Sequence, residues 1–238
     1  MGFDILGIIP ARGGSKGIPR KNVRQVGGRP LIAWTWEAAQ VTPTVTRLIV
    51  STDDQEIAGL ARAAGIEIPF IRPAQFASDT ASAIDVVSHA LNWLQEQEQY
   101  RPDFVLWLQP TSPLRTSADI EAAATLAQEK AADSVISVCP VEHQHPALMK
   151  RVESNGLLKS WQDDQTLIQR RQELPPVYCL NGAIYLIRRE VLLEQQTFYP
   201  EATFAYVMPS ERSLDIDTPW DLYLVDLILK DRCKHELD

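Results

Sequence analysis

Residues 5–22 read ILGIIPARGGSKGIPRKN, a short apolar run that passes directly into a glycine-rich basic loop. A run of this length and composition is typical of a buried strand. Gly13, Gly14 and Gly17 permit positive φ angles and let backbone N–H groups approach a ligand closely. Arg12 and Lys21 add positive charge. Backbone donors and cations at the end of a strand suit a polyphosphate, although neither GxxxxGK[ST] nor GxGxxG is present.

The charge distribution supports an anion site. The chain carries 23 basic and 31 acidic residues, a net charge of −8, so general nucleic-acid binding is not expected. Residues 5–36, however, contain no Asp or Glu and hold six basic residues: Arg12, Lys16, Arg20, Lys21, Arg24 and Arg29. A local cationic stretch on an acidic protein indicates a small anion held in one place. The alternative is a solvated basic loop.

Length and composition limit the class of protein. The 238 residues suffice for a single domain spanning 1–238, with 45% hydrophobic and 23% charged residues. No apolar run reaches the roughly 18 residues that cross a bilayer, and no basic leader precedes an apolar segment. The three cysteines are far apart in sequence, so no disulfide framework is expected. We therefore expect a cytoplasmic protein without a membrane partner.

The apolar pattern predicts an α/β fold. Short apolar runs at 5–10, 47–51, 65–71, 103–108, 134–139 and 183–187 are interpreted as strands. Helical patterns lie near 30–40, 54–64, 81–97 and 117–131. This alternation predicts a mostly parallel sheet with helices on both faces, whose strands end at one ligand-binding edge.

The alternation of strand and helix patterns stops after Cys139. Residues 140–180 are rich in Pro, Gln and His and are interpreted as an inserted arm. A last helix is expected to begin at Thr218, with Trp220, Leu224, Leu227 and Ile228 on its buried face.

Two further polar segments are expected at the same edge. LQPTSPLR (108–115) follows a strand, and its alternative role is a proline turn before a helix capped by Thr116 or Ser117. Asp215 and Asp217 are two residues apart, so on extended backbone they face the same side. Two carboxylates opposite a phosphate loop suit Mg²⁺, while helix capping is the alternative for Asp217.

These motifs together resemble the bacterial N-acylneuraminate cytidylyltransferases. The resemblance runs over nearly the whole chain, through IIPARGGSKGIPRKN (8–22), IVSTDD (49–54), RPAQFASDTAS (72–82), LQPTSPLR (108–115), RQELP (171–175), NGAIY (181–185) and DIDT (215–218). It implies a Rossmann-like nucleotidyltransferase fold. It also implies transfer of CMP from CTP to a sialic-type sugar acid, with Mg²⁺ and release of diphosphate.

Site residues follow from the resemblance position by position. It implies nucleotide contacts at Arg12, Ser15, Lys16, Lys21, Asn22, Arg72 and Ser82. It implies sugar-acid contacts at Gln109, Asn181, Tyr185, Phe198 and Tyr199, and at Lys150 and Arg171 on an arm that reaches across a homodimer. Asp215 and Asp217 match metal ligands; Lys21, Arg12 and Asp215 are the candidate catalytic residues, with Asp215 alternatively a general base.

Departures from the family pattern keep the acceptor open. Many sialate enzymes have arginine two residues before the Asn-Gly pair, where this chain has Cys179. Legionaminic or pseudaminic acid is therefore an alternative acceptor. KDO is an alternative of lower rank, because the KDO cytidylyltransferases share the reaction but have a different first loop. Functions of other classes are a GT-A-type glycosyltransferase using Asp215-Ile-Asp217 as its metal motif, and a non-catalytic nucleotide-binding module.

Overall fold

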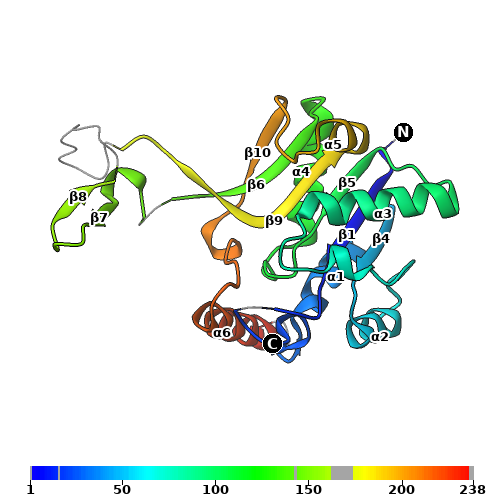
Figure 1. Ribbon diagram of the computed structural model, residues 1–238, viewed down its shortest axis with the longest axis horizontal. Helices are drawn as coiled ribbons and strands as arrows, with labels where there is room; N and C mark the ends of the chain where they lie inside the picture. The colour runs from blue at the N-terminus through cyan, green and yellow to red at the C-terminus, as the bar shows by residue number, and fades with distance from the viewer. Residues whose placement is uncertain (1, 16, 142–143, 162–173, 236–238) are drawn as a thin grey trace.

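A six-stranded sheet forms the centre of the protein in a computed structural model that describes residues 2–15, 17–141, 144–161 and 174–235. Its strand order is β10-β6-β9-β5-β1-β4 (Figure 1). The strands are β1 (Ile5–Pro10), β4 (Arg47–Ser51), β5 (Phe104–Trp107), β6 (Ser134–Pro140), β9 (Tyr178–Arg188) and β10 (Thr203–Val207). Every pairing is parallel except those of β9, which runs antiparallel to β5 and β6. The expected mostly parallel sheet is confirmed.

Helices cover both faces of the sheet because alternate strand residues point to opposite sides. Ile5 and Ile9 of β1 pack with α1 (Leu31–Gln40), α2 (Gln55–Ala63) and α4 (Ser117–Glu129). Leu6 and Ile8 pack instead with α3 (Ala83–Glu98) and α5 (Arg189–Gln195). Both clusters are almost fully buried and form the main core.

Three expectations about elements were wrong. Residues 65–71 form only two isolated bridges to β4 and its end, because Pro69 has no N–H to donate to a ladder. The strand β10 and the short helix α5 were not expected at all. The returning strand was expected at 183–187, but β9 begins earlier, at Tyr178.

The last helix, α6 (Pro219–His235), begins where expected and buries only part of the expected face: Ile228 packs against the buried cluster and Leu224 is half-buried, whereas Leu227 is exposed. Thr218 Oγ1 accepts a hydrogen bond from the Asp221 N–H (3.2 Å), and the Asp221 carboxylate accepts one from the Thr218 N–H (2.7 Å). Val225 and Leu229 are buried against the hairpin of β2 (Gln25–Val26) and β3 (Arg29–Pro30), whereas Trp220 is 63% exposed. The helix is apolar on several sides, so its periodicity did not reveal which side packs.

Of the arm, residues 140–180, the described parts (140–141, 144–161 and 174–180) extend away from the sheet (Figure 1). At its base β6 and β9 continue as a two-stranded ribbon in which Cys139 pairs with Cys179 and Pro140 with Tyr178. At its far end β7 (Lys150–Val152) and β8 (Leu158–Ser160) form a hairpin. The hairpin exposes large apolar side chains, including Val152 and Leu158. Among the described helices, none is long and apolar enough to cross a membrane.

Candidate active site

A cleft of about 340 Å³ lies at the ends of β1 and β5, the edge where the sequence placed the ligand. It brings together the loop after β1, the start of α3, the loop after β5 and the segment before α6. Eight residues selected from the sequence line it: Arg12, Lys21, Asn22, Arg72, Ser82, Gln109, Asp215 and Asp217.

The basic loop is held by the acids that follow β4. The Gly13 N–H donates to Asp53 Oδ1 at 3.0 Å, and a Cβ on Gly13 would lie only 2.5 Å from Asp54 Oδ2. Arg20 forms ion pairs with Asp54 and Glu56. The IVSTDD motif therefore fixes the shape of the phosphate loop.

The expected use of positive φ angles in this loop was wrong. Gly13, Gly14 and Gly17 are not among the glycines with positive φ; Arg20 is the left-handed residue, with φ 56°. Close approach is what requires Gly13 and Gly17, since a Cβ on Gly17 would lie 2.9 Å from the Asp217 carbonyl oxygen, whereas a Cβ on Gly14 would meet no atom within 4 Å.

Lys21 connects the basic loop to the acidic segment. It opens the short helix η1 (Lys21–Val23), and its Nζ donates to the Ile216 carbonyl at 2.6 Å and lies 3.9 Å from Asp217 Oδ1. The next residue, Asn22, donates through Nδ2 to the Arg12 carbonyl at 3.1 Å. The Lys21 ammonium is thus fixed on the cleft wall beside both carboxylates.

Asp215 and Asp217 both line the cleft, as their spacing predicted. The Asp217 side chain is 78% exposed. Asp215 is half-buried, and its Oδ1 has no hydrogen-bond partner among the described residues. Burial raises the pKa of Asp215, and the nearby Asp217 carboxylate adds to this rise, against hydrogen bonding from Thr111 and the charge of Lys21.

These two carboxylates fit a magnesium ion. No group of three or more His, Cys, Asp or Glu gathers anywhere in the described ranges. Mg²⁺ does not need one, because it is usually bound through one or two carboxylates together with substrate phosphates and water. The unpartnered Asp215 oxygen and the exposed Asp217 side chain are hard donors of the required kind.

Gly182 allows Gln109 and Asp215 to lie close to the backbone of β9. It has φ +70°, and a Cβ there would lie 2.9 Å from Gln109 Oε1 and 3.3 Å from Asp215 Oδ2. The Asn-Gly pair therefore brings Gln109 within reach of the carboxylates.

Arg72 is almost fully buried, and its guanidinium group forms hydrogen bonds with other residues of the protein. Its Nε donates to Ser51 Oγ at 3.0 Å, and its other nitrogens contact the carbonyls of Ser51 and Phe76. Burial lowers the pKa of Arg72 to about 10, partly offset by Asp53. Ser82 also has a structural role as the N-cap of α3, since its Oγ accepts from the Asp85 N–H at 3.1 Å.

An aromatic group backs the cleft. Trp107 lines it, and the Phe198 ring lies 6.1 Å from the Trp107 ring, centroid to centroid. Tyr185 packs on Phe198 at 5.5 Å and meets Tyr199 edge-on at 6.5 Å. Burial raises the pKa of Tyr185, and the neighbouring Tyr199 adds to this rise.

A family model described as cytidylyltransferase matches residues 6–228. The chain belongs to the cytidylyltransferase family. It is therefore a nucleotidyltransferase rather than a glycosyltransferase, and the resemblance inferred from its motifs is confirmed.

Curated relatives agree along the chain. A CMP-N,N'-diacetyllegionaminic acid synthase of Legionella pneumophila is 36% identical over 230 residues, 95% of this chain and 96% of its own. A pseudaminic acid cytidylyltransferase of Campylobacter jejuni is 31% identical over 94% of this chain and 95% of its own. An N-acylneuraminate cytidylyltransferase of Escherichia coli is 30% identical over 98% of this chain and 54% of its own.

A solved structure supports the fold. This cytidylyltransferase superposes with a TM-score of 0.71 and 20% identity on a CMP:2-keto-3-deoxy-manno-octonic acid synthetase complexed with CTP, covering 96% of this chain and 99% of the other. The nucleotidyltransferase fold is confirmed.

Six selected residues of the described ranges are not among those that line the cleft: Ser15, Lys150, Asn181, Tyr185, Phe198 and Tyr199. Lys16 and Arg171 lie outside the described residues. Ser15 is half-buried in the basic loop, and Lys150 lies on the arm with Nζ donating to Ser160 Oγ at 2.9 Å. Asn181 is 2% exposed. Its role as a sugar contact stays a prediction.

Sequence reasoning missed Thr111 and Trp107, which line the cleft of this cytidylyltransferase. The Thr111 carbonyl accepts from the Ile216 N–H at 2.9 Å and so joins the loop after β5 to the acidic segment. Trp107 was assigned only to a buried strand. Its place as the last residue of β5, at the ligand edge, was the available signal.

Proposed function

We propose that the enzyme transfers CMP from CTP to the anomeric hydroxyl of a nonulosonic acid and releases diphosphate. The observation that carries this proposal is the cleft itself, whose lining combines the cations Arg12 and Lys21 with the carboxylates Asp215 and Asp217. Relatives that span the full chain carry the names of nonulosonic acid cytidylyltransferases, which supports this acceptor class. The unpaired cysteines fit a reducing cytoplasm, where we place the reaction.

The basic loop binds the triphosphate in this proposal. Arg12 and Lys21 balance its charge, and Lys16 and Ser15 extend the same loop. As the sugar oxygen bonds to the α-phosphorus, the bond to the diphosphate oxygen breaks and the hydroxyl proton passes to solvent water. Negative charge then builds on the leaving diphosphate. Fixed cations stabilise it without reorganising, which is the main protein contribution to such transfers.

Asp215 and Asp217 hold Mg²⁺ in this proposal. The bound ion would neutralise phosphate oxygens and polarise the α-phosphorus. We assign Asp215 to metal binding rather than to a general-base role because its unpartnered oxygen lies in the same cleft as Asp217. In this proposal Asn22, Arg72 and Ser82 line the nucleoside side of the cleft and Gln109 lines the acceptor side. Tyr185, which packs on Phe198, belongs to the aromatic residues behind it.

One assay tests the reaction. Diphosphate release from CTP should require both a nonulosonic acid and Mg²⁺. Asp217→Ala should nearly abolish it while leaving the fold intact, because this side chain is 78% exposed. CTP binding without acceptor-dependent diphosphate release would indicate a non-catalytic nucleotide-binding protein instead.

The acceptor we favour within this class is legionaminic or pseudaminic acid rather than N-acetylneuraminic acid. Cys179 is exposed at the base of the arm and cannot supply the guanidinium that many sialate enzymes have there. The kcat/KM values for these acids, N-acetylneuraminate and KDO, measured side by side, test this choice. A strong preference for N-acetylneuraminate would contradict it and leave the reaction class untouched.

A further inference from the structure

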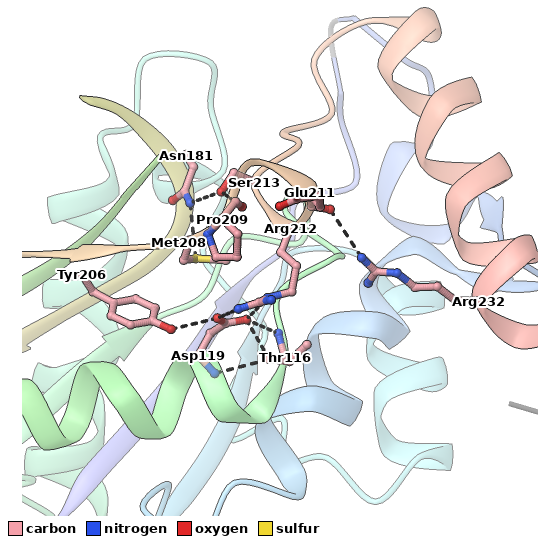
Figure 2. A network of polar contacts seen from close by, with 10 residues as sticks. All are labelled: Thr116, Asp119, Asn181, Tyr206, Met208, Pro209, Glu211, Arg212, Ser213 and Arg232. Atoms are coloured by element: carbon pink, nitrogen blue, oxygen red, sulfur yellow. Dashed lines mark hydrogen bonds and ion pairs between the residues drawn. The ribbon is translucent and has the colours of Figure 1, made fainter. Parts of the chain in front are cut away.

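Asp119 is a buried carboxylate at the start of α4 that the proposed chemistry does not use. Its side chain is fully buried, yet five hydrogen bonds reach its two oxygens (Figure 2). Oδ2 accepts from the Thr116 N–H (2.9 Å), Thr116 Oγ1 (2.7 Å) and Arg212 Nε (2.9 Å). Oδ1 accepts from Tyr206 Oη (2.9 Å) and Arg212 Nη2 (2.7 Å).

Capping alone does not explain this cluster. A capping box needs only Thr116 and Asp119, and α3 has the same box without any arginine. Arg212 adds a two-pronged ion pair from a segment far along the chain. Burial alone would raise the pKa of Asp119, but the hydrogen bonds from Arg212, Thr116 and Tyr206 outweigh it and keep the pKa below the usual value.

The pair joins the two segments that carry the cleft residues. Thr116 and Asp119 stand just beyond the loop with Gln109 and Thr111, while Arg212 ends η5 (Ser210–Arg212), three residues before Asp215. Next to Arg212, Ser213 Oγ donates to the Pro209 carbonyl (2.8 Å) and accepts from Asn181 Nδ2 (3.0 Å), as Figure 2 shows. These hydrogen bonds therefore restrain the segment that runs from β10 to the carboxylates Asp215 and Asp217.

We propose that Asp119 and Arg212 are positioning residues that set the separation between the carboxylates Asp215 and Asp217 and the acceptor-side residue Gln109. Neither Asp119 nor Arg212 lines the cleft. The pair acts through residues 213–217. Among the described residues, one backbone hydrogen bond joins these residues to the loop after β5, from the Ile216 N–H to the Thr111 carbonyl. The inference rests on the proposed metal-binding role of Asp215 and Asp217.

The test compares Arg212→Lys with a matched arginine far from the cleft. Lysine keeps the charge and loses the two-pronged geometry, so the buried carboxylate is still neutralised. The control is Arg47→Lys. Arg47 also pairs with two carboxylate oxygens, of Glu67 (2.6 Å) and Glu98 (2.7 Å), but at the start of β4, the opposite end of that strand from the cleft. Mn²⁺ serves as a spectroscopic probe of the metal site.

We expect Arg212→Lys to weaken Mn²⁺ binding to the CTP complex, measured by electron paramagnetic resonance, by about 10- to 100-fold. Its kcat should fall by up to about 100-fold, since small displacements of reacting groups have effects of that size. Arg47→Lys should lower only the unfolding temperature. Should Arg212→Lys misfold, the neutral pair Asp119→Asn with Arg212→Gln keeps hydrogen bonding without a buried charge, and the same Mn²⁺ and kcat losses are expected.

The outcomes separate this proposal from the proposed function. Unchanged Mn²⁺ affinity and kcat in a folded Arg212→Lys protein, with both lost in Asp217→Ala, would overturn the positioning role alone. Unchanged Mn²⁺ affinity in Asp217→Ala would overturn the metal site on which it rests. A loss of unfolding temperature in Arg212→Lys without any change in Mn²⁺ affinity or kcat would make the pair merely structural.

Discussion

Lys21 lies between the phosphate loop and the acidic segment, and its surroundings predict its importance. Its Nζ is 2.6 Å from the Ile216 carbonyl and 3.9 Å from Asp217 Oδ1, so the charge is already in place before substrate binds. Lys21→Ala should remove about 2–4 kcal/mol of transition-state stabilisation, roughly a 30- to 1,000-fold loss in kcat/KM. The measurement is steady-state diphosphate release at saturating Mg²⁺.

Arg29 provides the matched control for this prediction. It belongs to the same acid-free stretch but pairs with Glu37 and lies over the Trp34 ring at 5.0 Å, outside the cleft. Arg29→Ala should leave kcat/KM close to the wild-type value. A larger loss for Arg29→Ala than for Lys21→Ala would place the phosphates elsewhere.

His89 makes stability depend on pH near neutrality. Its ring lies 4.7 Å from those of Phe70 and Phe76, and Nδ1 is buried without a partner among the described residues. Burial, with Arg72 adding like charge, lowers the pKa of His89 below its ordinary 6.5. The carboxylates of Asp85 and Glu96 line the hollow beside His89, and they do not reverse this shift.

The unfolded chain therefore binds a proton at His89 before the folded protein does. The contribution of His89 to the free energy of unfolding is fully present above pH 6.5. It is lost as the pH falls from 6.5 toward the pKa of His89 in the folded protein. The free energy of unfolding of His89→Phe, from urea titrations, should decrease less over that interval than that of the wild type. Parallel curves for the two proteins would contradict the assignment.

At the scale of elements, prediction succeeded where local pattern and packing agree. β1, β4, α2 and α4 are local, so apolar runs and, for α4, the cap at Thr116 were sufficient to place them. β10 was missed because its alternate residues are only partly buried and its partner β6 is distant in sequence. The antiparallel direction of β9 depends on the path of the arm, which no local signal encodes.

The same reasoning explains the success and failure at the site. Residues that follow strand ends meet at one edge, so motif positions predicted the cleft lining well. Asn181 shows the limit: its Oδ1 accepts from Ser137 Oγ (2.6 Å) and its Nδ2 donates to Ser213 Oγ (3.0 Å). A buried bridge between a strand and a distant segment is not visible in a sequence motif.

Ser82 is both the N-cap of α3 and a residue of the cleft lining, so its substitution tests whether this helix end contributes to the site. Its Oγ caps α3, and the Asp85 carboxylate accepts from the Ser82 N–H at 3.0 Å. Ser82→Ala should therefore lower the free energy of unfolding by about 1 kcal/mol, the usual value of such a cap. Urea denaturation measures this loss.

Ser82→Thr is the control for the cap because it keeps the hydroxyl. It should retain stability, and calorimetric titration with CTP then reports the cleft separately. Weaker CTP binding in the stable Ser82→Thr protein would show that the added methyl group meets the nucleotide. Equal stability of Ser82→Ala and wild type would contradict the capping role.

At the scale of the whole molecule, the described part of the arm leaves large apolar side chains exposed to solvent. Val152 is 72% exposed, Leu158 67% and Trp161 61%, on a hairpin that Figure 1 shows far from the rest of the sheet. Apolar surface of this kind usually marks an interface, and a two-fold partner would cover both arms at once. The chain should therefore sediment as a dimer, and Leu158→Lys should shift it toward monomer.

A dimer of this form should also share its active sites. Lys150 is the first residue of β7, at the far end of the arm in Figure 1, whereas Asp217 lines the cleft; the resemblance assigns Lys150 to a sugar-acid contact. If each Lys150 serves the partner's cleft, mixing Asp217→Ala with Lys150→Ala protein creates heterodimers in which one site carries neither change. After subunit exchange, activity should recover to at most about a quarter of wild type, because half the dimers are mixed and half their sites are intact. The Asp217→Ala protein mixed with itself controls for handling. Exchange demonstrated by mass spectrometry without any recovery would mean that each cleft is completed by its own chain.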